Sequence, residues 1–220
     1  MKTGLPFAFV PPEMRQAVAS RLRLVRAPHA RTLLASGAAS QDVYCLTAGA
    51  ARIVLHSQSG QEVSVRDLGT GEVFGELAAL DGGPRSASVV ANGPVEMAVM
   101  VRADFLLCME ASPAAALWLA RRLAAEVRRL TERVFELSAL NTAARLHCEL
   151  LRLARGIAPG TVLAPAPTHE ELANRIGTHR EAVTRELRRL AALGAIATAP
   201  RKLTFLDLTK LQAAASAPAG

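Results

Sequence analysis

THEELANRIGTHREAVTRELRRLAALG, residues 168–194, carries the clearest structural signal in this 220-residue chain. Residues 168–171 and 178–181 each have the T-x-x-E pattern of a capping box, in which a hydroxyl and a glutamate satisfy the free N–H groups at a helix start. Each box therefore predicts a helix start. Ile176-Gly177-Thr178 predicts a tight turn between the two helices, and two helices joined through a glycine turn are typical of a helix-turn-helix.

The residues that follow predict a wing. Gly194 ends the second helix. Residues 196–198 and 203–206 are short β-type runs, and Ala-Pro-Arg-Lys at 199–202 predicts the turn of a hairpin between them. We expect this winged helix-turn-helix to have a core made of Leu172, Ala173, Ile176, Val183, Leu187 and Leu190.

A long helix is predicted upstream, over residues 113–144, because neither glycine nor proline interrupts it after its first residue. Apolar residues spaced 4, 3, 4 and 3 apart form the a/d seam of a coiled coil at Leu123, Val127, Leu130, Val134 and Leu137. This seam is narrower than the stripe of a helix that packs on a globular domain, so we expect it to join a homodimer. A helix packed on its own domain is the alternative. A second helical run at 141–155 and a loop at 156–167 follow.

The N-terminal half, residues 30–101, has short β-type runs broken by Gly, Asp and Ser, which indicates a small antiparallel barrel or roll. Strands are expected at 51–56, 62–67, 86–91 and 95–101. In the first strand we expect Ile53 and Leu55 to face the core while Arg52, Val54 and His56 face water, and we expect residues 58–60 to form a turn. A short amphipathic helix starting at Pro11-Pro12-Glu13, with Met14, Ala17, Leu22 and Leu24 on its apolar face, is expected to cover the roll.

Composition narrows the classes of function. The formal charge is +7, and residues 141–220 carry 11 Lys/Arg against 6 Asp/Glu, which suits a polyanion such as DNA. Cys45, Cys108 and Cys148 lie far apart, so neither a disulfide framework nor a metal cluster is predicted, and we expect a cytoplasmic protein. No leader or long apolar run predicts membrane attachment. The chain lacks G-x-x-x-x-G-K-[ST], H-E-x-x-H and G-x-S-x-G, so no enzyme is predicted.

FGELAALDGGPRSA, residues 74–87, has the chemistry of an anion site. Gly75 permits close backbone approach, and the short helical turn after it can direct N–H groups at an anion. Arg85 supplies a planar guanidinium for two phosphate oxygens, and Ser86 adds a hydroxyl. Glu76 has no nucleophile or metal beside it, so it binds and does not catalyse. The alternative is a salt bridge between Glu76 and Arg85 in a chain that binds nothing.

A roll, a long helix and a winged helix-turn-helix in this order, together with this cassette, resemble the CRP/FNR family over nearly the whole chain. The resemblance implies an α+β fold with a cyclic-nucleotide-binding β-roll of the jelly-roll type at 1–112. It implies a dimerisation helix at 113–140 and a DNA-binding domain at 141–220. It further implies that Glu76 accepts a hydrogen bond from a ribose hydroxyl and that Arg85 pairs with a cyclic phosphate. The effector site is expected to comprise Gly75, Glu76, Leu77, Arg85, Ser86, Ala87 and Thr131.

The effector expected from the resemblance is cyclic AMP, in preference to cyclic GMP, a cyclic dinucleotide or another metabolite. Leu130 and Thr131 match two adjacent hydroxyl residues that contact adenine in the family, and Thr131 keeps its hydroxyl. No metal or covalent cofactor is expected, because the N-terminal cysteine cluster of the oxygen-sensing branch is missing and His29 and His56 form no haem ligand set.

The resemblance also implies how DNA is read. Arg180, Glu181 and Arg185 match the family's base-reading residues in type and spacing, which implies a TGTGA-like half-site and its inverted repeat. The full DNA-contacting set is expected to be Thr168, His179, Arg180, Glu181, Thr184, Arg185, Arg188 and Lys202, with Arg188 and Lys202 on phosphates. We expect an effector-responsive regulator that works with RNA polymerase. The alternatives are the same fold with another effector or none, and a regulatory subunit acting on a partner protein.

Overall fold

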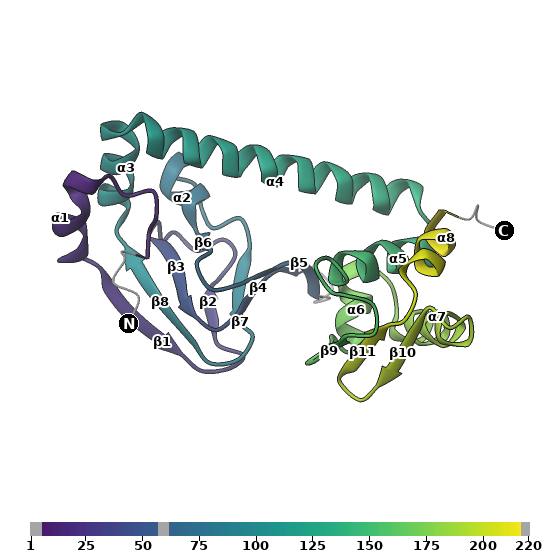
Figure 1. Ribbon diagram of the computed structural model, residues 1–220. Coiled ribbons are helices and arrows are strands. Elements are labelled where there is room, and N and C mark those ends of the chain that lie inside the picture. Colours follow the sequence, from purple (N-terminus) through teal and green to yellow (C-terminus); the bar gives the residue numbers. More distant parts are fainter. Residues whose placement is uncertain (1–5, 57–61, 217–220) are drawn as a thin grey trace. The chain divides into compact units, whose positions relative to one another are not determined.

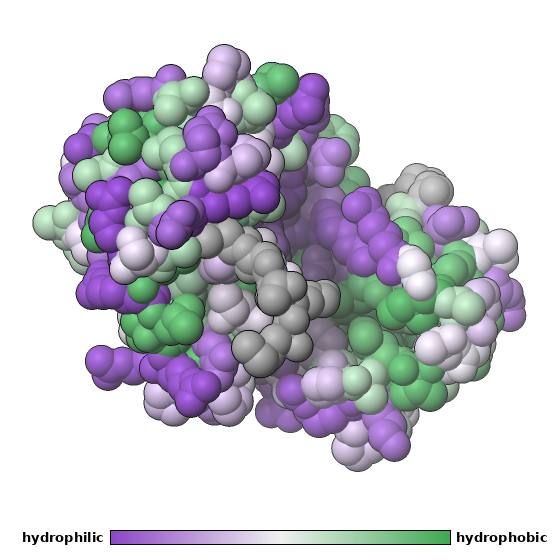
Figure 2. Space-filling model, turned by 60° about the vertical axis from the view of Figure 1, so that its left-hand side comes forward, coloured by the Kyte–Doolittle hydropathy of each residue, from purple (hydrophilic) through white to green (hydrophobic). Residues whose placement is uncertain are grey.

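The structure is a computed structural model that describes residues 6–56 and 62–216 (Figure 1). It divides into two compact units, Met1–Val127 and Arg128–Gly220, with the boundary inside the long helix. Apolar and polar side chains are interspersed on the surface, as Figure 2 shows for one face. The expected division at residues 112 and 140 stays a prediction.

Two antiparallel four-stranded sheets form the roll of the N-terminal unit. One sheet has the order β1 (Arg23–Ala27), β8 (Val95–Met100), β3 (Val43–Ala48) and β6 (Val73–Phe74). The other has the order β2 (Thr32–Leu34), β7 (Ser88–Ala91), β4 (Ala51–His56) and β5 (Glu62–Leu68). The apolar core includes Leu46, Leu68 and Phe74, each at most 2% exposed. The expected roll is confirmed.

The expected inward face of β4 is wrong at Val54 and Leu55, whereas Ile53 packs against the core as expected. Val54 is 1% exposed, whereas Leu55 is 43% exposed. A register shift between Ile53 and Val54 marks a β-bulge against β5. The register passes from Arg66 to Ser64 and skips Val65, so the extra residue of the bulge lies in β5, and the bulge locally twists the pair of strands beside Val54. The turn expected at residues 58–60 lies outside the described residues.

Helices close one end of the roll (Figure 1). The expected N-terminal helix is shorter than predicted, since a 3₁₀ turn at Pro12–Met14 and α1 (Arg15–Ala19) end before β1. Its buried residue is Val18, and Leu24 lies in β1 with 79% of its surface exposed. The helices α2 (Glu76–Asp81) and α3 (Arg102–Ala111) precede the long helix α4 (Pro113–Ala139).

The long helix ends earlier than the predicted residue 144. Asn141 caps the next helix, α5 (Thr142–Leu153), by accepting a 2.9 Å hydrogen bond at Oδ1 from the Ala144 N–H. A side-chain cap satisfies a free N–H group at a new helix start, so the chain breaks here although no glycine or proline is present. No single helix within residues 6–56 and 62–216 is long and apolar enough to span a membrane. The helices α3 and α4 reach that length and composition only together, and they are bent by 110° at the break between them.

The C-terminal unit contains the predicted winged helix-turn-helix. Its helices are α6 (His169–Ile176), α7 (Arg180–Ala192) and α8 (Leu208–Ser216), and its sheet has the order β10 (Ile196–Ala199), β11 (Lys202–Phe205) and β9 (Val162–Leu163). All six expected core residues are buried, none more than 3% exposed. The sequence reasoning missed β9, which adds a third strand to the wing by pairing Leu163 with Leu203.

Candidate functional site

Arg85 is a buried cation at the end of the cassette, with 3% of its surface exposed. Its Nη1 and Nη2 donate to the main-chain carbonyls of Gly75 and Asp42, each at 2.7 Å, and its Nε donates to Ser40 Oγ at 3.1 Å. The guanidinium lies 5.7 Å from the centre of the Tyr44 ring. Among the described residues no carboxylate lies within ion-pair distance of it. Burial lowers the pKa of Arg85 from its ordinary value, although nearby Tyr44 and Asp42 oppose the shift.

This arrangement suits an anion. Burying a charge costs free energy unless an opposite charge compensates it. Here the Arg85 guanidinium is held by two carbonyl oxygens and one hydroxyl oxygen, all of them neutral. A guanidinium has five N–H donors and the protein uses three, so two stay available for a second set of acceptors. The carbonyls fix the orientation of the guanidinium without neutralising it.

Glu76, the first residue of α2, does not pair with Arg85. Its Oε1 lies 3.6 Å from Nε of Arg122 on α4, and the Arg122 guanidinium also donates to the Val73 carbonyl. The salt bridge between Glu76 and Arg85, which was the alternative to ligand binding, is therefore absent from the described residues. The cassette instead contacts the long helix α4 through the pair of Glu76 and Arg122, and Arg85 takes no part in this pair.

Gly75 fits the close approach expected of it. Its φ is +83°, and a Cβ placed there would lie 2.7 Å from Arg85 Nη1 and 3.1 Å from the Asp42 carbonyl oxygen. A side chain at this position would strain the backbone and displace the guanidinium. Glycine is thus needed at position 75 for two reasons: the backbone is left-handed there, and Arg85 occupies the space of a side chain.

The other expected effector residues are less enclosed. Leu77 is 42% exposed, Ser86 is exposed and Ala87 is half-buried. Thr131 lies exposed on the part of α4 that belongs to the C-terminal unit, and its contact with an effector stays a prediction.

Four residues of the cassette's surroundings were missed by the sequence reasoning: Ser40, Asp42, Tyr44 and Arg122. Three of them precede the cassette by 30 to 34 residues in the chain and reach it only through the strand pairing of the roll. Nothing in the sequence distinguishes Arg122 from the other arginines of α4.

The candidate nucleic-acid interface lies on α6 and α7. The first capping box is confirmed, since Thr168 Oγ1 accepts from the Glu171 N–H at 3.1 Å and Glu171 Oε2 accepts from the Thr168 N–H at 2.7 Å. The second box is wrong, because His179 is the N-cap of α7 and makes no side-chain cap hydrogen bond. Gly177 ends α6 with φ +64°, as the expected turn requires.

A hydrogen bond to a buried imidazole fixes α7 from its inner side. His147 on α5 is 2% exposed, and its Nε2 lies 2.6 Å from Glu186 Oε1. Burial alone would raise the pKa of Glu186, but hydrogen bonds from Arg189 and His147 outweigh burial and lower that pKa. Glu186 is therefore ionised at neutral pH and holds α7 against α5.

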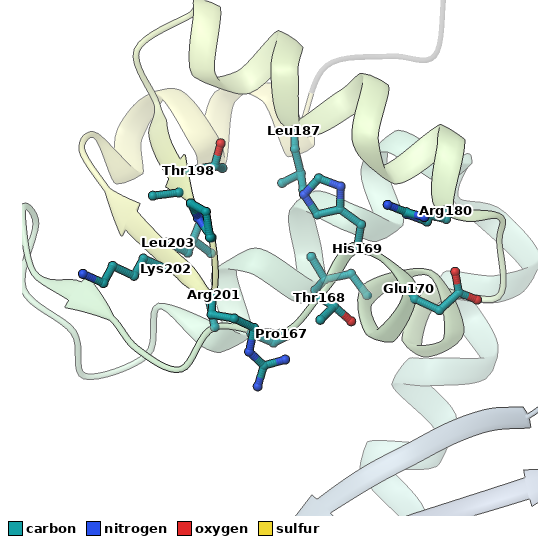
Figure 3. Close-up of a pocket in the computed structure, with 14 residues that line it drawn as sticks. Pro167, Thr168, His169, Glu170, Arg180, Leu187, Thr198, Arg201, Lys202 and Leu203 are labelled. Carbon is teal, nitrogen blue, oxygen red and sulfur yellow. The ribbon is translucent and has the colours of Figure 1, made fainter.

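The outward side of α7 presents the expected reading residues. His179, Arg180, Glu181, Arg185 and Arg188 are exposed, Thr184 is half-buried, and Lys202 is exposed on the wing. A cavity of about 670 Å³ lies between the start of α6, the start of α7 and the wing, and Figure 3 shows its lining. Thr168, Arg180 and Lys202 line it together. The structure thus brings three of the predicted DNA-contacting residues, from three elements, to one concave surface.

The seam residues of α4 are exposed in the single chain. Val127 and Val134 are each 63% exposed, Leu130 is 43% and Leu137 is 44%, whereas Leu123 is half-buried against the core of the N-terminal unit. Phe135, next to the seam, is also 62% exposed. A row of exposed apolar side chains on one helix is typical of an interaction surface.

Comparison with known proteins identifies both domains of the chain. The cyclic nucleotide-binding domain model matches residues 24–112, and the Crp-like helix-turn-helix domain model matches residues 144–214. The chain is 34% identical over 189 residues to the cyclic AMP receptor protein of Thermus thermophilus, with 84% of each chain covered. It is 28% identical over 209 residues to the CRP-like cAMP-activated global transcriptional regulator of Mycobacterium tuberculosis, with 93% of each covered.

A solved structure shares the fold. The chain aligns with FixK2 from Bradyrhizobium japonicum with a TM-score of 0.78 at 19% identity, which covers 90% of this chain and 99% of that one. The two domain models together span more than half of the 220 residues. The chain therefore belongs to the CRP/FNR family of DNA-binding transcriptional regulators, a family without enzymatic activity.

Proposed function

We propose that this protein is a cytoplasmic transcription regulator that is controlled by cyclic AMP and binds a palindromic TGTGA-like DNA site as a homodimer. In this proposal the roll binds the effector, α4 joins two copies, and α7 enters the major groove of each half-site. RNA polymerase is the further partner through which bound DNA is transcribed.

The observation that carries the effector proposal is Arg85. A guanidinium that is 3% exposed, that has no carboxylate partner among the described residues and that is held by two carbonyls is prepared for an anion with two free oxygens. A cyclic phosphate has that form. The relatives from T. thermophilus and M. tuberculosis are named as a cyclic AMP receptor protein and a cAMP-activated regulator, which favours cyclic AMP among anionic effectors.

Calorimetry of the purified protein with cyclic AMP, cyclic GMP and cyclic di-GMP tests the effector. We expect cyclic AMP to bind most tightly and Arg85→Gln to weaken it by about 10-fold to 150-fold, since a charge-assisted hydrogen bond contributes about 1.5 to 3 kcal/mol. Arg26→Gln is the matched control, because Arg26 is an exposed arginine of the same unit paired with Glu96. Urea unfolding of both variants separates lost binding from lost folding. Absence of nucleotide binding by the unaltered protein would refute the proposal.

The DNA-reading proposal rests on the exposed trio of Arg180, Glu181 and Arg185 at the start of a helix whose inner side is buried. Arginine suits the O6 and N7 acceptors of guanine, and glutamate suits the N4 donor of cytosine. Lys202 lies on the wing, where we expect it to contact phosphate.

Selection of binding sites from random DNA tests this assignment. We expect TGTGA-like half-sites centred about 34 to 36 Å apart, one helical turn, in an inverted repeat. Glu181→Ala should relax the choice at one base pair at a cost of about 1 to 3 kcal/mol, whereas Lys202→Ala should weaken all sequences alike. A selected motif that does not change in Glu181→Ala would contradict the assigned role of that glutamate.

A further inference from the structure

His169, the first residue of α6, lines the cavity between the two helices of the helix-turn-helix and the wing, and it was absent from the expected DNA-contacting set. Figure 3 shows its ring directed towards α7, between the labelled side chains of Leu187 and Arg180. Its Nδ1 lies 2.8 Å from Thr184 Oγ1. The side chain is half-buried, so the ring is held in one orientation while part of it stays accessible.

The hydrogen bonds of Thr184 determine which ring nitrogen carries the proton. Thr184 Oγ1 donates to the Arg180 carbonyl at 3.0 Å, and a hydroxyl has only one hydrogen to donate. Thr184 is therefore the acceptor in its contact with His169, and Nδ1 of His169 is the donor. In the neutral ring the other nitrogen, Nε2, then has a lone pair and no hydrogen.

The charges around this ring are mostly positive. Burial, followed by Arg180 and Arg188 on α7, lowers the pKa of His169 from its ordinary value of 6.5. The charged groups that line the cavity with it, or lie beside it on α6, are Glu170, Glu171, Arg180, Arg201 and Lys202. Glu171 is already engaged, because its carboxylate accepts from the Thr168 N–H and pairs with Arg201. Free protein near neutral pH thus holds His169 neutral, with a lone pair that repels phosphate oxygens.

We propose that His169 is a proton-dependent contact to the DNA backbone, neutral in the free protein and protonated at Nε2 when a phosphate lies in the cavity. In a helix-turn-helix the first helix crosses the backbone while the second lies in the groove, so the start of α6 is placed for a phosphate. The protonated ring keeps its Nδ1–H bond to Thr184 and gains an Nε2–H donor. The inference rests on the proposed DNA-binding role of this face.

The sign of the pH dependence follows from linkage. A phosphate beside the ring favours the charged form, so the pKa of His169 is higher in the complex than in the free protein, where it lies below 6.5. DNA binding then takes up a proton, and affinity rises as the pH falls from about 8 towards the pKa of the free protein. Below that pKa both states are protonated and the gain ends.

Binding of a labelled TGTGA-type duplex by the full-length protein, measured from about pH 8.0 to 5.5 at constant ionic strength, tests the proposal. We expect DNA affinity to rise about tenfold for each half-site over this range, as one charge-assisted contact per half-site allows. In His169→Gln, which removes the titrating group, most of this rise should disappear. His29→Gln is the matched control, because His29 is an exposed histidine of the N-terminal unit and is not among the expected DNA-contacting residues.

A second measurement separates phosphate contact from base reading. The slope of log affinity against log salt should be steeper at pH 5.5 than at pH 8.0 by about 0.9 for each half-site, because each new phosphate contact releases counterions. His169→Arg, a permanent cation, should bind at pH 8.0 as the unaltered protein does at pH 5.5. Equal pH dependence in the unaltered protein and His169→Gln would overturn the proposal, as would a pH effect without a change in salt slope. Failure to bind any DNA at pH 5.5 or 8.0 would instead refute the proposed function.

Discussion

Gly75 and Arg85 define each other's geometry at the scale of single residues. The Gly75 carbonyl accepts from Arg85 Nη1, and the space where a Gly75 side chain would lie is occupied by the same nitrogen. One glycine therefore supplies an acceptor, a left-handed turn before α2 and room for the guanidinium. The orientation of the buried cation depends on all three.

Gly75→Ala should lower the stability of the fold and should, in addition, weaken effector binding. Gly71→Ala is the matched control, since Gly71 has φ +90° in the same roll and nothing lies within 4 Å of its would-be Cβ. Both variants should lose about 1 to 2 kcal/mol of unfolding free energy from left-handed strain, measured in urea. Only Gly75→Ala should also weaken cyclic AMP binding, by about tenfold or more, because its methyl group displaces Arg85. Equal affinity in the two variants would contradict this role.

At the scale of elements, buried ion pairs connect three helices of the C-terminal unit. Glu136 on α4 pairs with Arg133 and with Arg152 on α5, and Glu149 on α5 pairs with Arg152 at 2.8 Å and with Arg175 on α6 at 2.9 Å. Glu136 is 9% exposed and Glu149 is 7% exposed. The chain of pairs runs from the end of α4 through α5 to the first helix of the helix-turn-helix.

Glu149→Gln should destabilise the C-terminal unit by about 2 to 3 kcal/mol, below the range for a fully buried pair because Arg152 is about a third exposed. The loss follows because two guanidinium groups would keep their charge without this carboxylate. Urea unfolding measures it, with Glu132→Gln, an exposed glutamate on α4, as the control. The loss should persist in 1 M NaCl, since buried pairs are screened little. A loss that vanished in salt would identify these as surface pairs.

Local sequence patterns predicted elements better than they predicted contacts between elements. Thr168 and Glu171 stand within one turn, so their capping box was visible in the sequence and is confirmed. The second box has the same letters, yet His179 takes the cap position. The bulge in β5 opposite Ile53 and Val54 depends on the pairing of β5 with β4, which alternation within a single strand does not encode.

The residues of the candidate site, like the elements of the fold, were predicted from local patterns, but their distant contacts were not. The cassette's own residues were identified, because a glycine, a glutamate and an arginine at this spacing have recognisable chemistry. The partners of Arg85 were not, because Ser40 and Asp42 are brought to it by the pairing of β3 with β6 and β8. Contacts of this kind depend on the tertiary fold.

At the scale of the whole molecule, we expect a second copy of the chain to cover the exposed seam of α4. Leu130→Asp together with Val134→Asp should give a monomer in analytical ultracentrifugation, because the two side chains are 43% and 63% exposed in the single chain and support no core within it. Leu117→Asp is the control, since Leu117 is a 49% exposed leucine on the same helix outside the seam.

The monomeric variant should keep cyclic AMP binding in calorimetry if the cassette acts within one copy, and it should bind an inverted-repeat duplex far more weakly, since only one half-site is then engaged at a time. A double variant that sediments as a dimer would show that the copies meet elsewhere.

The way Arg85 is held has a consequence for how the regulator handles its signal. Its partners are carbonyls and a hydroxyl, none of which gains or loses a proton between pH 4 and 9, and arginine itself stays charged throughout that range. The binding of the effector's phosphate by Arg85 should therefore not depend on pH in this range. With His169 acting as proposed, acidification would raise the DNA affinity of the regulator, while the binding of the effector's phosphate by Arg85 would stay unchanged.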